Sequence, residues 1–483
     1  MSEDSKMNLK DIIMMLEKDV EIFRSDEGEA YVKLNSSPVA VESDDFESFF
    51  RQYCYTRLDK IIPSSTASAQ AQAHLKMLAL NSNHRTLCRR ITIRKGNVYY
   101  DLGLDKNRYL KISKAQVGVV ETTRLLFLRN SVFLPQVEPD LTGQPEGILS
   151  LIDKHFHIKQ ESDKIILATF LIGCFFTSKV STPILQVYGE KGSGKTLFIE
   201  HILSLLNPTS AGGYSLPRKA DDVAIVLSSD YMVIFDNVSW ISNEISDLFC
   251  RNCTGGTQVK RRFFTDNSQR LLKLGAVVVF NSTHQSVMRS DLADRTLYFQ
   301  LERFRQEERQ GDYTLNRSWK KDLPAFFGDL CLAVQGVLND SQEAEYQSPI
   351  RLTDWYELCV KAGRQLGYSE EDVYFAFEEN RKRATESIVG GDVLLYSIEQ
   401  FMLQKEYKKY NSYETALTLS CTEWFQILKS FTLDNCGIRK GFPGAPEVLT
   451  RRMGENRSNL EEIRIYFEIK KKHDKNQISI WKE

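Results

Sequence analysis

The stretch from Gly189 to Thr196 reads GEKGSGKT, and these residue types at this spacing are typical of a phosphate-binding Walker A loop. Glycines let the backbone wrap around phosphates with its N–H groups pointing inward, and a following helix adds its positive dipole. We expect Lys195 to reach the β- and γ-phosphates of ATP and the Thr196 hydroxyl to hold Mg²⁺. The expected nucleotide-binding residues are Gly189, Glu190, Lys191, Gly192, Ser193, Gly194, Lys195, Thr196 and Leu197.

A second group of polar residues follows the apolar run MVIF, which ends at Asp236. A carboxylate at this place predicts a Walker B site that holds Mg²⁺ together with Thr196. The next residue, Asn237, stands where many P-loop motors carry a glutamate. An amide can orient a water but cannot accept its proton, and phosphoryl transfer depends mainly on positioning, so we expect Asn237 to act in catalysis without being a base. Glu190, Glu244 and Asp247 stay open as sources of a carboxylate.

Two further residues have types and places that suit γ-phosphate chemistry. Asn281 ends the apolar run AVVVF, where its amide could reach the γ-phosphate and the attacking water. Arg295 lies fourteen residues later, just before another apolar run. An arginine beside Asp294 is more often a surface ion pair, but its order after the other motifs favours an arginine finger that contacts the nucleotide of a neighbouring subunit. A finger acting in trans predicts an oligomer.

Basic and aromatic residues gather between Asp236 and Asn281, where Lys260, Arg261 and Arg262 precede Phe263 and Phe264. Cations can contact DNA phosphates and aromatic rings can stack on bases, so this group predicts a DNA-binding hairpin. A solvated edge hairpin without that function explains the pattern equally well. Because the formal net charge of the chain is −1, any nucleic-acid contact has to be local.

The elements around these motifs predict an α/β fold. Apolar runs at 184–188, 231–235, 276–280 and 296–301 read as buried strands, and residues 197–206 have apolar side chains at helical spacing. Buried strands that alternate with helices favour a parallel sheet. The longest apolar run, Ile165–Phe176, is too short to span a bilayer and reads as a buried helix.

Three domains are expected: residues 1–135, 136–365 and 366–483. The first is a small α+β unit with a helix over 63–80 and a hairpin around Lys95–Asn97. Prolines and glycines in 134–147 predict a linker or an extended crossing. In the last unit, we expect a helix over 414–431 and then a helix followed by two strands around a charged turn at 471–476, which favours a winged-helix-like module over a helical cap with a terminal hairpin.

Nine cysteines without a framework spacing, a polar amino-terminal stretch and no apolar run of membrane length favour a cytoplasmic protein without a membrane partner. Cys250 and Cys253 form a CxxC pair with no second pair at zinc-finger distance, so a buried helical pair is expected in place of a metal site.

The series of motifs resembles the ATPase part of phage- and mobile-element-encoded primase–helicase-like proteins, and more distantly the superfamily 3 and minichromosome-maintenance-type AAA+ helicases. The order of Walker A, Walker B, hairpin, sensor 1 (Asn281) and arginine finger (Arg295) is similar to theirs. The segment SPIRLTDWYELCVKAG looks like their sensor 2 helix, with Arg351 as its arginine. The resemblance is strongest over residues 180–365. It implies an AAA+ core that forms a hexameric ring with DNA in its channel and ATP between subunits.

These features predict an ATP-dependent DNA helicase or replication initiator of a mobile genetic element, acting on single-stranded or forked DNA in the bacterial cytoplasm. Three alternatives stay open. The first is a DNA-responsive ATPase that acts in regulation or anti-phage defence without unwinding. The second is an ATP-loaded DNA platform with slow hydrolysis. A small-molecule P-loop kinase is the third, although such an enzyme has no need for Asn281 and Arg295. A priming activity is not expected, because no polymerase carboxylate pattern or primase zinc motif is present.

Overall fold

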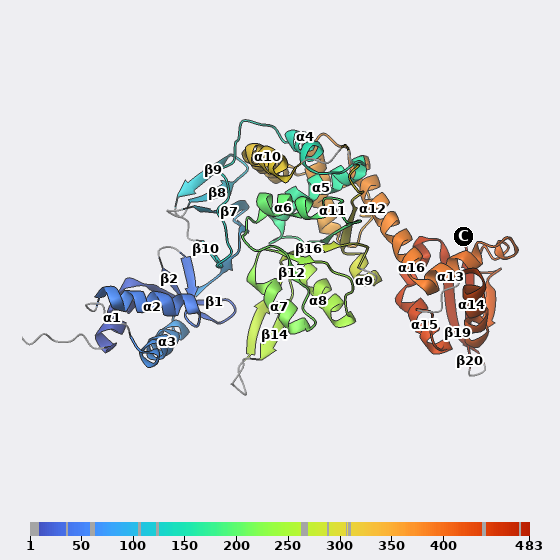
Figure 1. Cartoon of the computed structure of the whole chain (residues 1–483), viewed down its shortest axis with the longest axis horizontal. Coiled ribbons are helices and arrows are strands. Elements are labelled where there is room, and N and C mark those ends of the chain that lie inside the picture. The colour runs from blue at the N-terminus through green and yellow to red at the C-terminus, as the bar shows by residue number, and fades with distance from the viewer. Residues whose placement is uncertain are drawn as a thin grey trace, which may run out of the picture.

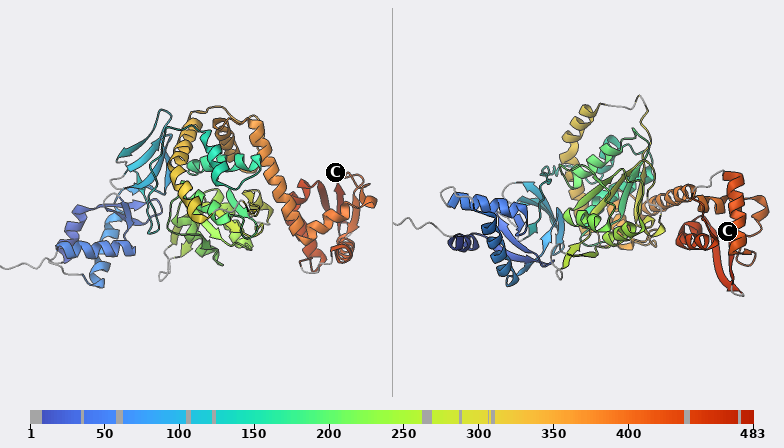
Figure 2. Two further views of the ribbon diagram at one scale, coloured as in Figure 1. Left: turned by 45° about the horizontal axis from the view of Figure 1, so that its top comes forward. Right: turned by 60° about the horizontal axis from the view of Figure 1, so that its bottom comes forward.

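The computed structural model describes residues 9–34, 37–57, 63–104, 108–121, 125–261, 269–286, 289–305, 307, 311–436, 441–472 and 475–483. The chain forms a mixed α/β structure with a parallel sheet at its centre. The amino-terminal helices and strands lie at one end of the molecule and the carboxyl-terminal elements at the other, and this arrangement holds in all three views (Figures 1 and 2).

The amino-terminal part packs three helices on a four-stranded sheet of order β3-β2-β1-β4. Its elements are α1 (Leu9–Asp19), β1 (Glu21–Ser25), β2 (Ala30–Leu34), β3 (Ser37–Ala40), α2 (Asp44–Arg57), α3 (Ser65–Leu80) and β4 (His84–Arg85). The helix predicted over 63–80 is confirmed as α3. It begins after Ser64, whose side chain accepts a hydrogen bond from the N–H of Ala67. A separate cluster of buried side chains, including Leu16, Phe50 and Leu75, forms the core of this part.

A second antiparallel sheet contains β6 (Ile91–Arg94), β7 (Asn97–Leu104), β8 (Arg108–Ile112) and β9 (Val117–Glu121), in that order. The predicted hairpin is confirmed, since Arg94 pairs with Asn97 across a turn in which Lys95 and Gly96 have φ of 50° and 77°. The short strands β5 (Leu87–Cys88) and β10 (Leu126–Phe127) pair in parallel beside it.

This second sheet shares its core with the centre of the molecule. Val98, Tyr100 and Leu110 belong to the same buried cluster as the helices that cover the central sheet. Polar groups add to the contact: Arg90, almost fully buried, donates to the carbonyl oxygens of Leu134 and Pro208 at 2.9 and 2.7 Å. The predicted boundary at residue 135 therefore stays a prediction, and the shared core is an argument against it.

The central sheet has five parallel strands in the order β12-β13-β16-β11-β17. Their bounds are β11 (Ile184–Tyr188), β12 (Tyr214–Ser215), β13 (Met232–Asp236), β16 (Val277–Ser282) and β17 (Thr296–Gln300). Four of them are the strands expected from the apolar runs. Almost every residue of these four is buried, as expected for a sheet that is covered on both faces.

Alternate residues of the strands face two separate cores. Leu185, Ile234 and Val279 lie in the core with α5 (Glu161–Gly173) and α6 (Lys195–Leu206), whereas Phe235 and Phe280 lie in the core with α7 (Ala220–Ser229) and α8 (Asn243–Cys253). The first core also contains residues of α4 (Gly147–His155), α10 (Asp312–Asn339), α11 (Thr353–Gln365) and α12 (Glu370–Gly391). The apolar run at 165–176 forms the end of α5 and a 3₁₀ turn, and it is buried as predicted. Cys250 and Cys253 are buried on α8, also as predicted.

The carboxyl-terminal elements surround a further core that includes Trp424 and Ile478. They are α13 (Val393–Met402), a 3₁₀ turn (Lys405–Tyr407), β18 (Leu417–Ser420), α14 (Cys421–Cys436), α15 (Pro446–Glu455), α16 (Arg457–Glu462), β19 (Ile465–Lys472) and β20 (Lys475–Lys482). The helix predicted before the two terminal strands is confirmed as α15, and the terminal hairpin is confirmed as β19 and β20. The prediction of one helical region over 414–431 was wrong at its start, because residues 417–420 pair with β20 and complete a sheet of order β18-β20-β19.

Across the described part of the chain, no helix combines the length and the apolar character needed to cross a membrane.

Candidate nucleotide site and arginine cluster

The glycine loop joins the carboxyl end of β11 to the amino end of α6, which is the setting that a phosphate-binding loop requires. Gly194 has φ of 82°, and a Cβ there would come within 2.6 Å of the Phe304 ring. A Cβ on Gly189 would lie 2.2 Å from the carbonyl oxygen of Leu301. The backbone path and these close contacts explain why glycine occupies both positions.

Lys195 is the first residue of α6, and its ammonium group folds over the loop. Its Nζ donates to the carbonyl oxygens of Gly189 at 2.7 Å and Glu190 at 2.9 Å. Burial lowers the pKa of Lys195, and the negative charge of Asp236 opposes that shift. The lysine charge and the Asp236 carboxylate thus act on each other across the loop.

The order of the strands brings Asn281 between the two predicted phosphate motifs. β16 lies between β11 and β13, so its carboxyl end lies between the loop and Asp236. The Asn281 side chain donates from Nδ2 to Oδ1 of Asp236 at 2.5 Å. Its own Oδ1 is buried without a hydrogen-bond partner among the described residues. A buried amide oxygen without a partner keeps an unused capacity to accept a hydrogen bond.

The residues present also fit a magnesium ion. Among the described residues, the hydrogen bonds of the Asp236 carboxylate both involve Oδ1, which accepts from Asn281 and from the N–H of Asn237 at 3.0 Å. Oδ2 is left to face an ion or its water shell. Thr196, the second residue of α6, supplies a hydroxyl at the amino end of the same helix. A carboxylate and a hydroxyl are the oxygen donors expected for Mg²⁺ beside a nucleotide.

The backbone conformation at position 237 favours asparagine over glutamate. Its φ is 52°, in the left-handed region, which asparagine tolerates better than most residues. The turn is fixed on its other side by a hydrogen bond of 2.9 Å from the N–H of Val238 to the carbonyl oxygen of Asn281. Of the alternative carboxylates, Asp247 pairs with Arg289 at 2.8 Å, while Glu190 and Glu244 are exposed.

Arg295 and Arg351 lie away from the glycine loop of their own chain. The carbonyl oxygen of Arg295 accepts a hydrogen bond from the N–H of Ile184, at the amino end of β11, whereas the loop leaves its carboxyl end. A strand of this length separates the two by about 15 Å. Both guanidinium groups instead donate to Oδ1 of Asp291 on α9 (Ser290–Ala293), at 2.7 Å from Arg295 and 2.8 Å from Arg351.

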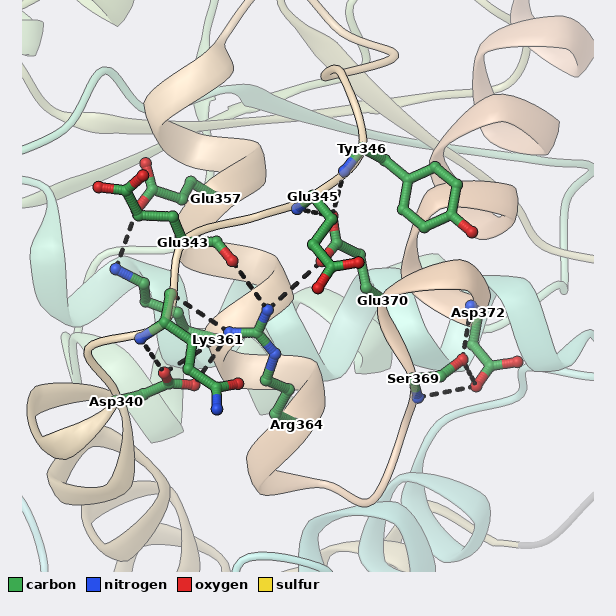
Figure 3. Close-up of polar contacts among 11 residues, drawn as sticks. Asp340, Glu343, Glu345, Tyr346, Glu357, Lys361, Arg364, Ser369, Glu370 and Asp372 are labelled. Atoms are coloured by element: carbon green, nitrogen blue, oxygen red, sulfur yellow. Dashed lines mark hydrogen bonds and ion pairs between the residues drawn. The ribbon is translucent and has the colours of Figure 1, made fainter.

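The segment before Arg351 is held by a polar network (Figure 3). Arg364 on α11 donates to the carboxylates of Asp340 and Glu370 at 3.3 Å and to the carbonyl oxygen of Glu343 at 3.1 Å. Glu370 in turn accepts from the N–H groups of Glu345 and Tyr346, each at 2.7 Å. The connection from α10 to α11 is therefore tied to both α11 and α12 before it reaches Arg351.

Lys260 and Arg261 of the predicted DNA-binding group lie on β14 (Thr257–Arg261), which forms an antiparallel pair with β15 (Gln269–Lys273). Its backbone extends away from the body of the molecule at the lower edge of Figure 1. Lys260 pairs with Arg270 and Arg261 with Gln269 in the backbone register. Arg262 and Phe263 lie outside the described residues, so the predicted DNA contact stays a prediction.

Two features of the site had no clear signal in the sequence. Phe304 packs against the glycine loop and lies 4.1 Å, between ring centroids, from His157. Asp291 joins the two arginines, although it sits in an ordinary polar stretch, RSDLADR, where Asp294 was the expected partner of Arg295. An acidic residue four positions before an arginine on a helix is a weak signal for such a pair.

Comparison with known proteins gives one family. Residues 149–380 match the family described as actinomycete integrative conjugative element replication protein, and this segment carries the glycine loop, Asp236, Asn281 and both arginines. No curated protein matches the chain.

Two solved structures are among those similar to this chain. The structure titled "SCCmec type IV Cch - active helicase" aligns with a TM-score of 0.47 and 13% identity over 95% of this chain and 92% of its own. The "A form apo structure of NrS-1 C terminal region-CTR" aligns with a TM-score of 0.42 and 12% identity over the whole of both chains. Because both TM-scores are below 0.5, the fold rests on the strand order and the contacts given above.

Proposed function

We propose that this chain is an AAA+ ATPase that forms a ring, moves on DNA as a helicase and starts the replication of a mobile genetic element. The match of residues 149–380 to a replication protein family supports the replication role. The observation that carries the proposal is the division of the site. Lys195, Asp236 and Asn281 meet at the carboxyl edge of the central sheet, while Arg295 and Arg351 sit together at the amino edge.

Each edge supplies half of an ATPase site. The glycine loop and Lys195 bind the β- and γ-phosphates, and Thr196 with Asp236 would hold Mg²⁺, which neutralises charge on the transferring phosphate. Asn281 and Asn237 orient the attacking water through their amides. Arg295 and Arg351 stabilise the transition state on the neighbouring subunit, which explains why Arg295 lies at the opposite edge of the sheet from its own loop and shares Asp291 with Arg351 there. Such head-to-tail contacts close into a ring, for which we propose a hexamer.

DNA would pass through the ring and contact the β14–β15 hairpin through Lys260, Arg261, Arg262 and Phe263. The exposed hairpin backbone and the near-neutral charge of the whole chain support a local contact. The carboxyl-terminal part, in which β18 pairs with β20 beside β19 and helices α13 to α16, supports a winged-helix-like module. For the amino-terminal part, β4 (His84–Arg85) belongs to the first sheet and β6 (Ile91–Arg94) to the second, so the shared core favours a boundary between residues 85 and 91 instead of 135. We place the protein in the cytoplasm of a bacterial host.

The direct test measures ATP hydrolysis with and without single-stranded DNA, and then strand displacement on a forked duplex. We expect DNA to stimulate hydrolysis and ATP to drive displacement, with Lys195→Ala as the inactive control. Particle images should show six-fold symmetry. Hydrolysis that DNA leaves unchanged, together with intact forks, would exclude the helicase.

The hairpin has a test of its own. The double change Lys260→Ala with Arg262→Ala should weaken DNA binding and reduce the slope of log affinity against log salt by about 2, because two fewer phosphate contacts release fewer counterions. Binding is measured by fluorescence anisotropy at several salt concentrations. A matched pair of changes on another exposed surface, Lys320→Ala with Lys321→Ala, serves as the control. An unchanged slope in the hairpin variant would refute the DNA contact.

A second function follows from Asn237. Since an amide stands where a proton acceptor is common in motors, slow hydrolysis could serve a DNA-responsive switch in regulation or defence. Hydrolysis stimulated by DNA, combined with no strand displacement at any ATP concentration, would favour this function over the helicase.

A further inference from the structure

One carboxylate oxygen joins the two arginines of the cluster. Oδ1 of Asp291 accepts from Nη1 of Arg295 at 2.7 Å and from Nη1 of Arg351 at 2.8 Å. The two arginines come from distant parts of the chain, one before β17 and the other before α11, and meet at a single residue of α9. Two guanidinium groups repel each other at this range, and a carboxylate between them offsets that repulsion.

The two arginines differ in freedom. The side chain of Arg295 is 11% exposed, and it also donates to the carbonyl oxygen of Asp291 and contacts the sulfur of Cys250 at 3.9 Å. The side chain of Arg351 is 54% exposed and borders a groove of about 320 Å³ between α9 and the α15–α16 region. Arg295 is thus fixed within the protein, while Arg351 presents its charge to open space.

The backbone on the Arg351 side is also fixed. The network around Arg364 holds the segment that precedes Arg351 (Figure 3). In addition, Arg381 on α12 donates to the carbonyl oxygen of Pro349 at 2.9 Å. With its backbone held on one side, the guanidinium of Arg351 takes its direction from Asp291. The geometry is that of a preorganised pair of cations whose mutual spacing depends on one carboxylate.

We propose that Asp291 is a positioning residue that sets Arg295 and Arg351 as a two-arginine clamp for the triphosphate bound by a second copy of the chain. This inference rests on the proposed function. Asp291 does not contact the nucleotide; it fixes how far apart and in which direction the two guanidinium groups are presented. The clamp belongs to one chain and the phosphates that it serves belong to the next.

An ion pair in the amino-terminal part provides a matched control. On α2, Glu47 and Arg51 form an ion pair of 2.5 Å, and their side chains are 37% and 43% exposed. Such an exposed pair contributes little to stability. Glu47→Gln therefore removes one negative charge, as Asp291→Asn does, without touching the two arginines.

The first experiment compares steady-state ATP hydrolysis by Asp291→Asn, Glu47→Gln and the unaltered protein, each as the full chain. We expect Asp291→Asn to lower kcat about 100-fold, the cost of a misplaced catalytic group, with KM changed by less than about twofold. Glu47→Gln should keep the kcat of the unaltered protein. Equal kcat in all three would overturn the positioning role. Inactivity of the unaltered protein would instead refute the proposed function.

The second experiment mixes variants to ask which chain uses Asp291. Lys195→Ala has a damaged phosphate loop and an intact clamp, whereas Asp291→Asn has the opposite. In a one-to-one mixed ring, about a quarter of the interfaces join an intact loop to an intact clamp, so hydrolysis should recover above that of either variant alone. A mixture of Arg295→Ala with Lys195→Ala should recover in the same way. If the mixture with Arg295→Ala recovers and the mixture with Asp291→Asn does not, the proposal is overturned. Asp291 would then serve the nucleotide site of its own chain.

Folding is checked on the same samples by thermal unfolding. If Asp291→Asn unfolds early, Asp291→Glu keeps the charge and moves it by one methylene group. We then expect a kcat between those of the unaltered protein and Arg295→Ala, with KM unchanged. A kcat equal to that of the unaltered protein would overturn the positioning role.

Discussion

At the carboxyl edge of the central sheet, Lys195, Asp236 and Asn281 contact one another or lie within electrostatic reach, whereas at the amino edge Arg295 and Arg351 share the carboxylate of Asp291. Under the proposed function, the first group surrounds the phosphates of ATP. The second group is satisfied within its own chain, where Arg295 is enclosed by the protein and Arg351 is exposed. If the proposal holds, the difference teaches that one chain supplies a nucleotide-binding half at one edge and a separate, preassembled catalytic half at the other.

The largest effect is expected at the carboxyl edge. Lys195→Ala should abolish ATP binding as well as hydrolysis, because the ammonium group that neutralises the β- and γ-phosphates is lost. Binding is measured with a fluorescent ATP analogue and hydrolysis by phosphate release. Intact ATP binding in this variant would contradict the assignment of the whole site.

At the amino edge, binding and hydrolysis should separate. Arg295→Ala should leave ATP binding intact and lower hydrolysis by about 1,000-fold or more, as expected for an arginine finger. The measurement is the same pair of assays, with size-exclusion chromatography to follow assembly. Loss of binding together with conversion to monomers would instead identify Arg295 as an interface ion pair.

Phe304 tests how tightly the carboxyl edge is packed. Phe304→Ala should raise KM for ATP about fivefold with little change in kcat, since the glycine loop loses the ring that lies against Gly194. Steady-state kinetics separates the two constants. Phe304→Leu, which keeps an apolar side chain, is the control and should behave like the unaltered protein. A fall in kcat with constant KM would assign the ring a different role.

The smallest effect concerns the turn that follows β13 at the carboxyl edge. At Asn237, alanine should be less stable than glycine by about 1 kcal/mol, because φ of 52° strains any residue with a Cβ. Urea unfolding of the two variants measures this difference. Equal stabilities would show that the turn relaxes, and Asn237→Glu could then be tried as a way to raise hydrolysis.

The sequence predicted well what local patterns encode. The loop spacing, the apolar strands and the order of motifs were enough to single out Lys195, Asp236 and Asn281 as candidate site residues. They were also enough to predict the central strands of the sheet. Because the carboxyl ends of parallel strands lie at one edge, these residues could be expected to meet. Asp291 could not be found in this way, since its role depends on an arginine sixty positions away that approaches from another element.

Packing between sheets was equally hidden. Strands β6, β7, β8 and β9 form an antiparallel sheet, and the alternation of apolar and polar residues along a strand does not show which part of the protein covers it. The side chains of Arg90, Tyr100 and Gln136 donate to carbonyl oxygens at and just beyond the end of α6, which begins with Lys195. Contacts of this kind join segments that the sequence separates by more than sixty residues.

Helix α12 has a mechanical consequence. Its amino end is fixed by a capping box at Ser369 and its middle by two hydrogen bonds between Asn380 and the backbone of Tyr298 on β17, while its far end leads directly into α13. The part of α12 from Asn380 to Gly391 is about 17 Å long, so a tilt of about 10° about the fixed middle would move the far end by about 3 Å. A small rotation of the central sheet would therefore displace the carboxyl-terminal part.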